Sequence, residues 1–179
     1  METITEILSK YHTLVLNNLF IGLLFVKLVS CFFIKDFYPI AKEIIRWMIL
    51  GFAATSLLYW AFCLIGDSSL QQRAIGQYAW TFWLVLFLSD ILPFALLIKR
   101  IKNKGWSILT ILLFMNFARG MEWLVVNGVS GSGWSIGVSL SPLLIFLGGG
   151  ILTGLVITGI SIAILKFRKT ELPENINNK

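Results

Sequence analysis

The stretch YAWTFWLVLFLSDILPFALLIKRIK, residues 78–102, decides the class of this protein. Its apolar part, residues 78–98, runs directly into the cations Lys99 and Arg100. A helix rises about 1.5 Å per residue, so a run of this length crosses the roughly 30 Å hydrocarbon core of a bilayer. Basic residues at one end of such a run favour the cytoplasmic face. The stretch therefore predicts a transmembrane helix that ends in the cytoplasm.

Four other runs have the same apolar character: residues 13–34, 45–65, 106–127 and 142–165. They are too long for transmembrane strands and lack strict alternation of polar and apolar residues. The 179 residues are 57% hydrophobic and 13% charged, which excludes a soluble domain around one small core. We therefore predict an all-α integral membrane bundle of about five transmembrane helices. Residues 1–169 form a single domain, and the polar residues 170–179 form a disordered cytoplasmic tail.

The net charge of +6 comes from cations beside the ends of the apolar runs. One side carries Lys35, Lys42, Arg46, Lys99, Arg100, Lys102, Lys104, Lys166, Arg168 and Lys169, and the other carries only Lys10 and Arg73. By the positive-inside rule, the N-terminus lies outside and the C-terminus in the cytoplasm. The positive charge thus sets orientation, and no nucleic acid partner is expected.

The sequence offers few ligands for a metal or a covalent cofactor. His12 is the single histidine, and Cys31 and Cys63 lack the CxxC spacing of a metal or thiol-redox site. One histidine cannot ligate a bis-histidine haem, and two cysteines cannot hold an iron–sulphur cluster. We expect any tightly bound redox centre to belong to a partner protein.

Asp90 is the most informative polar residue within a predicted span. A charge at the centre of a span costs about 2.5 to 3.5 kcal/mol on insertion scales, so its presence asks for a reason. It follows Ser89 and lies nine residues before Lys99, close to mid-membrane. Pro93 has no N–H to bond the carbonyl oxygen of Ser89. The pattern predicts a kinked proton or ligand site.

Asn116, Arg119 and Glu122 are spaced three residues apart, which places them along one stripe of the fourth predicted helix. Arg119 and Glu122 can pair across one turn. Two interpretations are open: a neutralised structural ion pair between helices, or a functional polar path.

Three further features have simple structural explanations. Lys27 lies eight residues before Lys35, so its side chain can snorkel to the cytoplasmic interface. His12, Asn17 and Asn18 lie at the outer end of the first run, where they can exchange protons or bond a small ligand, although an interfacial histidine can simply be solvated. Small residues recur every four positions from Gly150 in the fifth run, which favours close approach of another helix.

Four short motifs, in order, resemble the NrfD-like membrane subunits of polysulphide reductase and alternative complex III. HTLVLNNLF (residues 12–20) is similar to the family's HTTIFPPYF, and GQYAWTFW (76–83) to its GPYAW and the aromatic segment that follows. SDILPFALLIKRIK (89–102) resembles N-x-x-x-PQLFWFKKIR, and NFARGMEWLVV (116–126) aligns without gaps on NIGMWFERFVI. The chain resembles the C-terminal half of such a subunit, apart from the fifth run.

The resemblance implies a four-helix bundle plus one helix, in a quinone-linked oxidoreductase complex of the bacterial cytoplasmic membrane. The partners would be other membrane subunits and extramembrane iron–sulphur or haem subunits, and the chain by itself would not be an enzyme. His12, Asn17 and Asn18 would form a quinone pocket or exchange protons outside. Ser89, Asp90, Asn116, Arg119 and Glu122 would form a proton path.

The chain also departs from the family pattern. Asn17 and Asn18 replace paired prolines, Trp123 replaces an arginine, and the SxxR segment that follows is absent. Arg119 could supply the missing positive charge one turn earlier. Two alternatives stay open: a structural or assembly subunit without its own site, and a small transporter or sensor. Transporter folds usually show two matching halves, which five spans do not give unless the protein dimerises.

Overall fold

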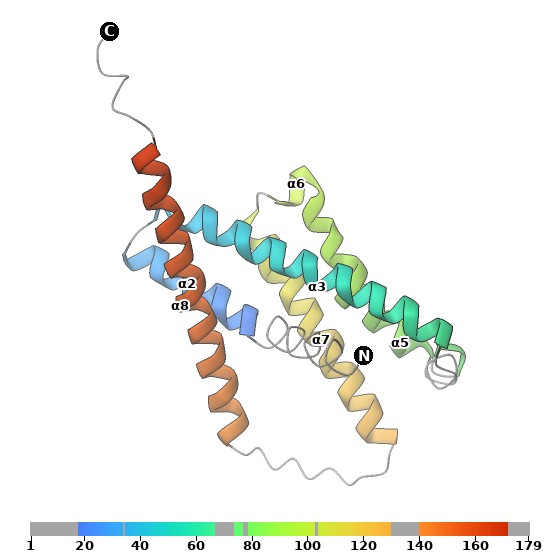
Figure 1. Cartoon of the computed structure of the whole chain (residues 1–179). Coiled ribbons are helices and arrows are strands. Elements are labelled where there is room, and N and C mark those ends of the chain that lie inside the picture. Colours follow the sequence, from blue (N-terminus) through green and yellow to red (C-terminus); the bar gives the residue numbers. More distant parts are fainter. Residues whose placement is uncertain are drawn as a thin grey trace.

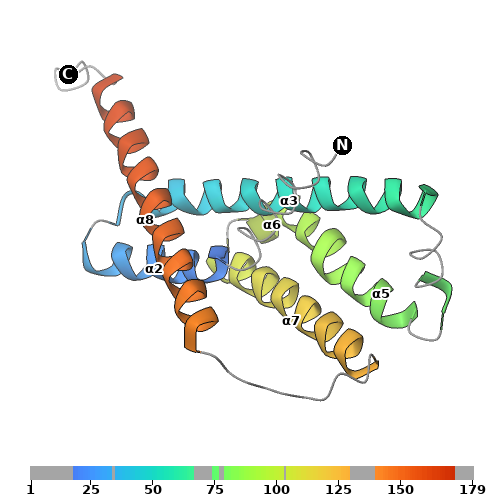
Figure 2. The same ribbon diagram turned by 60° about the horizontal axis from the view of Figure 1, so that its bottom comes forward.

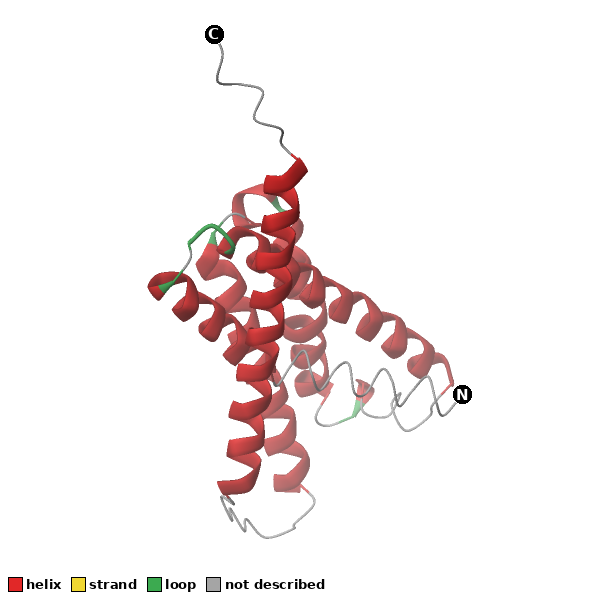
Figure 3. Cartoon of the chain, turned by 60° about the vertical axis from the view of Figure 1, so that its left-hand side comes forward, coloured by secondary structure: helices red, strands yellow, loops and turns green. Residues whose placement is uncertain are grey.

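The computed structural model describes residues 18–33, 35–66, 74–76, 79–102, 104–129 and 140–171. Its main elements in these ranges are α2 (Leu19–Phe32), α3 (Tyr38–Gly66), α5 (Ala79–Leu86), the π-helix η2 (Phe87–Ile91), the 3-10 helix η3 (Leu92–Leu97), α6 (Lys99–Lys102), α7 (Gly105–Val129) and α8 (Leu140–Glu171). No strand occurs in the described part (Figure 3). The predicted all-α class is confirmed.

Three helical segments of the described chain are long and apolar enough to cross a membrane: Tyr38–Ala61, Ala79–Leu97 and Leu147–Arg168. Two shorter apolar helices, Leu19–Phe32 and Gly105–Ala118, overlap the other two predicted runs. Many large apolar side chains face outward, among them Trp47 and Leu152 at 57% and 63% exposure. An apolar exterior of this kind suits a lipid environment.

Helix α3 begins at Tyr38, seven residues before the predicted start at 45. Proline is tolerated in the first turn of a helix, so Pro39 does not oppose this early start. Phe37 and Ala41 are fully buried, which attaches the start of α3 to the core. At the other end of the chain, α8 extends to Glu171, and residues 172–179 lie outside the described part.

The buried core joins α2, α3, η3, α7 and, through Ile157, α8. Its largest fully buried members include Leu19, Phe37, Phe52, Leu96 and Met115. The segment α5–η2–η3 and helix α7 lie side by side below α3 (Figure 2). The C-terminal end of α8, the short α6 and the start of α3 lie in the upper half of Figure 1, whereas the end of α7 and the start of α8 lie in the lower half.

Helices α2 and α8 cross at a seam of glycines. A Cβ on Gly150 would lie 2.4 Å from Cβ of Ile21, and one on Gly154 would lie 3.0 Å from the carbonyl oxygen of Gly22. Only glycine permits backbones to approach so closely. The predicted packing of a helix against this stripe is confirmed, and that helix is α2.

Candidate functional site

The predicted kink is a change of helix type around Pro93. The backbone N–H of Leu92 donates to the carbonyl oxygen of Phe87, five residues earlier, which is the π-helical pattern. The 3-10 helix η3 follows, with Pro93 at its start. Proline offers no N–H to the α-helical ladder, so the helix widens before it and tightens after it. Single π turns inside longer helices are rare and recur at functional sites.

Asp90 lies in this π-helix, in the middle of the candidate span Ala79–Leu97. Its exposure is 0%, and so is that of Ser89. Because a 3-10 helix rises about 2 Å per residue, Asp90 is on the order of 13 Å from Leu97 along the axis. A buried carboxyl group must be paired or hold a proton, because burying an isolated negative charge is costly. The structure thus encloses the Asp90 carboxyl group within protein, and its role in a proton or ligand site stays a prediction.

Two buried hydroxyl groups lie on this π-helix and on a helix that packs against it. Oγ of Ser89 is buried and has no hydrogen-bond partner among the described residues. Helix α3 packs against η2 and carries Ser56, whose buried Oγ also lacks a described partner. Hydroxyl groups donate and accept hydrogen bonds, so such groups can pass protons between neighbouring acids or bind an internal water.

Helix α7 packs against η2 and carries the predicted polar stripe. Asn116 is half-buried, and its Nδ2 donates to the carbonyl oxygen of Leu112 at 2.8 Å. Met115 and Ala118 are fully buried, so this part of α7 faces the interior. Arg119 and Glu122 lie in α7, but their side chains are outside the described part. Their pairing stays a prediction.

Of the three outer residues of the predicted site, Asn18 is the one within the described part. His12 and Asn17 lie outside the described residues. Asn18 precedes α2 without a side-chain cap, and its Oδ1 would lie 2.8 Å from a Cβ on Gly149. The described contacts of Asn18 are therefore with α8, as part of the glycine seam.

One buried charge was not anticipated from the sequence. In the sequence, Arg46 is interpreted as a cation at the membrane interface. In the structure, its side chain is only 6% exposed. It pairs with Oε1 of Glu43, which also accepts a hydrogen bond of 3.0 Å from Nε1 of Trp47. The Arg46 guanidinium lies 5.1 Å from the Trp47 ring centroid. The sequence does carry a signal for this cluster: Glu43, Arg46 and Trp47 are spaced so that their side chains can contact one another on one helix face.

Within the described residues, no group of three or more His, Cys, Asp or Glu side chains is placed to hold a metal ion. Comparison with protein-family models, curated proteins and solved structures found no match for this chain. A functional assignment therefore depends on the geometry around Asp90 and on the four sequence motifs.

Proposed function

We propose that this chain is a five-span membrane subunit, with its N-terminus outside, of a quinone-linked oxidoreductase complex in the bacterial cytoplasmic membrane. In this complex it anchors iron–sulphur or haem subunits and contributes a proton path. The observation that carries the proposal is Asp90, a fully enclosed carboxyl group in a π-helix at the middle of a candidate span. An ionisable group within a membrane span is a functional-site hypothesis by default, and proton relays are one of the roles that such groups take.

Asp90 would take up and release the proton. The hydroxyl of Ser89 adjoins it in the chain, and Asn116 lies on the helix that packs against the same π-helix. From Asn116 to Glu122 the stripe on α7 runs about 9 Å along the axis, in the direction of the outer face in the proposed orientation. We infer a proton series from Asp90 through Asn116 to Glu122, which internal waters and hydroxyl groups would bridge.

A proton path is favoured here over a quinone pocket. Asn18, the residue of the expected quinone site that the structure describes, packs against Gly149. Asp90 and Ser89, in contrast, are enclosed where a membrane proton carrier would need them. Electrons would pass through partner subunits, which supply the redox centres.

The test is purification of the tagged chain in mild detergent, identification of the proteins that come with it, and reconstitution of that assembly in liposomes. Asp90→Asn keeps the size of the side chain and removes its titratable proton. We expect protons translocated per electron to fall at least tenfold, with the assembly intact. Asp36→Asn, at an exposed position in the turn between α2 and α3, serves as the control and should leave translocation unchanged.

Two results would contradict the proposal. Isolation of the chain as a lone homo-oligomer, without haem or iron–sulphur proteins, would exclude its membership of an oxidoreductase complex. Unchanged proton translocation in Asp90→Asn, within an intact complex, would favour the structural or assembly subunit instead.

A further inference from the structure

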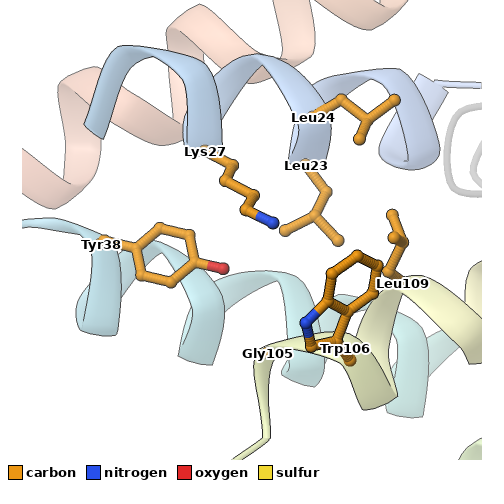
Figure 4. Close-up of a pocket in the computed structure, with 7 residues that line it drawn as sticks. All are labelled: Leu23, Leu24, Lys27, Tyr38, Gly105, Trp106 and Leu109. Carbon is orange, nitrogen blue, oxygen red and sulfur yellow. The ribbon is translucent and has the colours of Figure 1, made fainter. Parts of the chain in front are cut away.

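A second polar feature lies away from Asp90, where α2 meets the first residues of α3 and α7. It is a cavity of about 180 Å³. Its lining residues are Leu23, Leu24, Lys27, Tyr38, Gly105, Trp106 and Leu109 (Figure 4). The cavity therefore lies near the membrane face to which the cations were assigned.

One side of the cavity is polar and positive. Nζ of Lys27 lies 4.7 Å from the centroid of the Trp106 ring. Figure 4 shows the ammonium group of Lys27 and the hydroxyl of Tyr38 directed into the same space. The hydroxyl lies 3.3 Å from where a Cβ on Gly105 would be, so glycine leaves room for it against the first turn of α7.

The charge of the cavity is not balanced by its own lining. None of the seven lining residues is acidic, and the first turn of α7 has no acidic residue either. The N–H groups of that turn carry the positive end of the helix dipole, which adds to the charge of Lys27. A lysine, a hydroxyl donor and a helix N-terminus together suit a phosphate group.

The other side of the cavity is apolar and open. Leu23, Leu24 and Leu109 line it, and Leu24 and Trp106 are 42% and 70% exposed. One turn beyond Leu109 on α7, Leu113 is 55% exposed, so the apolar surface continues along the helix. A free inorganic anion has no part that packs against such a surface, whereas a lipid whose phosphate binds at Lys27 has an acyl chain that makes van der Waals contact with it.

We propose that this cavity binds an anionic phospholipid, with its phosphate at Lys27 and Tyr38 and one acyl chain along Leu24, Leu109 and Leu113. An anionic lipid is preferred over a zwitterionic one because the lining offers no carboxylate to pair with a choline or ethanolamine cation. Lys27 then has a ligand as well as a snorkelling path. This site is independent of the proton path through Asp90.

The test is titration of the detergent-purified full chain with dioleoyl phosphatidylglycerol and with dioleoyl phosphatidylcholine, read by native mass spectrometry. We expect tighter binding of the phosphatidylglycerol. Removal of one lysine at a lipid surface weakens binding about fivefold, and this is the loss expected for Lys27→Gln. Lys99→Gln, an exposed lysine on α6 outside the cavity, is the matched control and should bind as the wild type does.

Three results would overturn the site: equal affinity of the wild type for both lipids, unchanged phosphatidylglycerol binding in Lys27→Gln, or equal loss in Lys99→Gln. Inorganic phosphate that displaces the lipid at equal concentration would show an anion site without an acyl chain, and would also overturn it. If Lys27→Gln fails to fold, phosphatidylglycerol binding by Tyr38→Phe replaces it as the test, because this substitution removes only the hydroxyl group. Weaker phosphatidylglycerol binding is then expected, and unchanged binding would overturn the proposal.

Discussion

Arg46 shows how much a single charge depends on its neighbours. The Arg46 side chain is almost enclosed, and its described charge partner, Glu43, is 43% exposed. Removing one member of a buried pair leaves an uncompensated charge, which costs several kcal/mol in a dry site. Solvent screens the exposed carboxylate, so Glu43→Gln should lower the free energy of unfolding by about 1 kcal/mol.

A double-mutant cycle in detergent measures this coupling. In an Arg46→Met background, Glu43→Gln should cost little, because no buried cation remains to be compensated. Equal losses of unfolding free energy in the two backgrounds would show that Arg46 is not stabilised by the pair. Glu43 would then act through Trp47, from whose Nε1 it accepts a hydrogen bond.

At the scale of elements, the close packing of α2 against α8 means that neighbouring glycines differ in how well they tolerate a side chain. A Cβ on Gly150 meets Cβ of Ile21, an atom that cannot move without its backbone, whereas a Cβ on Gly148 meets nothing within 4 Å. Gly150→Ala should therefore lower the free energy of unfolding by about 1 to 3 kcal/mol through overpacking. Gly148→Ala should raise it by roughly 0.5 to 1 kcal/mol, because alanine is the better helix former.

Unfolding of both variants, followed by circular dichroism in detergent, tests the seam. Gly159→Ala is a second control on the same helix, since its added Cβ also has open space around it. Similar shifts in all three variants would mean that α2 does not approach α8 closely at Gly150.

The all-helical class could be predicted from the sequence, and Asp90 could be singled out there, because apolar run length and the cost of a buried charge are local properties. Pro93 predicted a break in the α-helix, because proline lacks a backbone N–H whatever its neighbours in the fold are. The cavity at Lys27 could not be predicted, since it needs Tyr38 and Trp106 from two other helices. Arg46 was misjudged for the same reason: its burial depends on how α3 packs.

At the scale of the whole molecule, the orientation of the bundle is open to a direct test. The cations of the start of α3, of α6 and of the end of α8 should all face the cytoplasm, because translocating Lys and Arg is unfavourable. Green fluorescent protein fused after Glu171 should therefore fluoresce, since it folds on the cytoplasmic side. Alkaline phosphatase fused after Gly66, at the opposite end of α3, should be active outside. A dark fluorescent protein after Glu171, together with active phosphatase at the same position, would show that the N-out arrangement is wrong. The stripe from Asn116 to Glu122 would then lead toward the cytoplasmic face instead of the outer face.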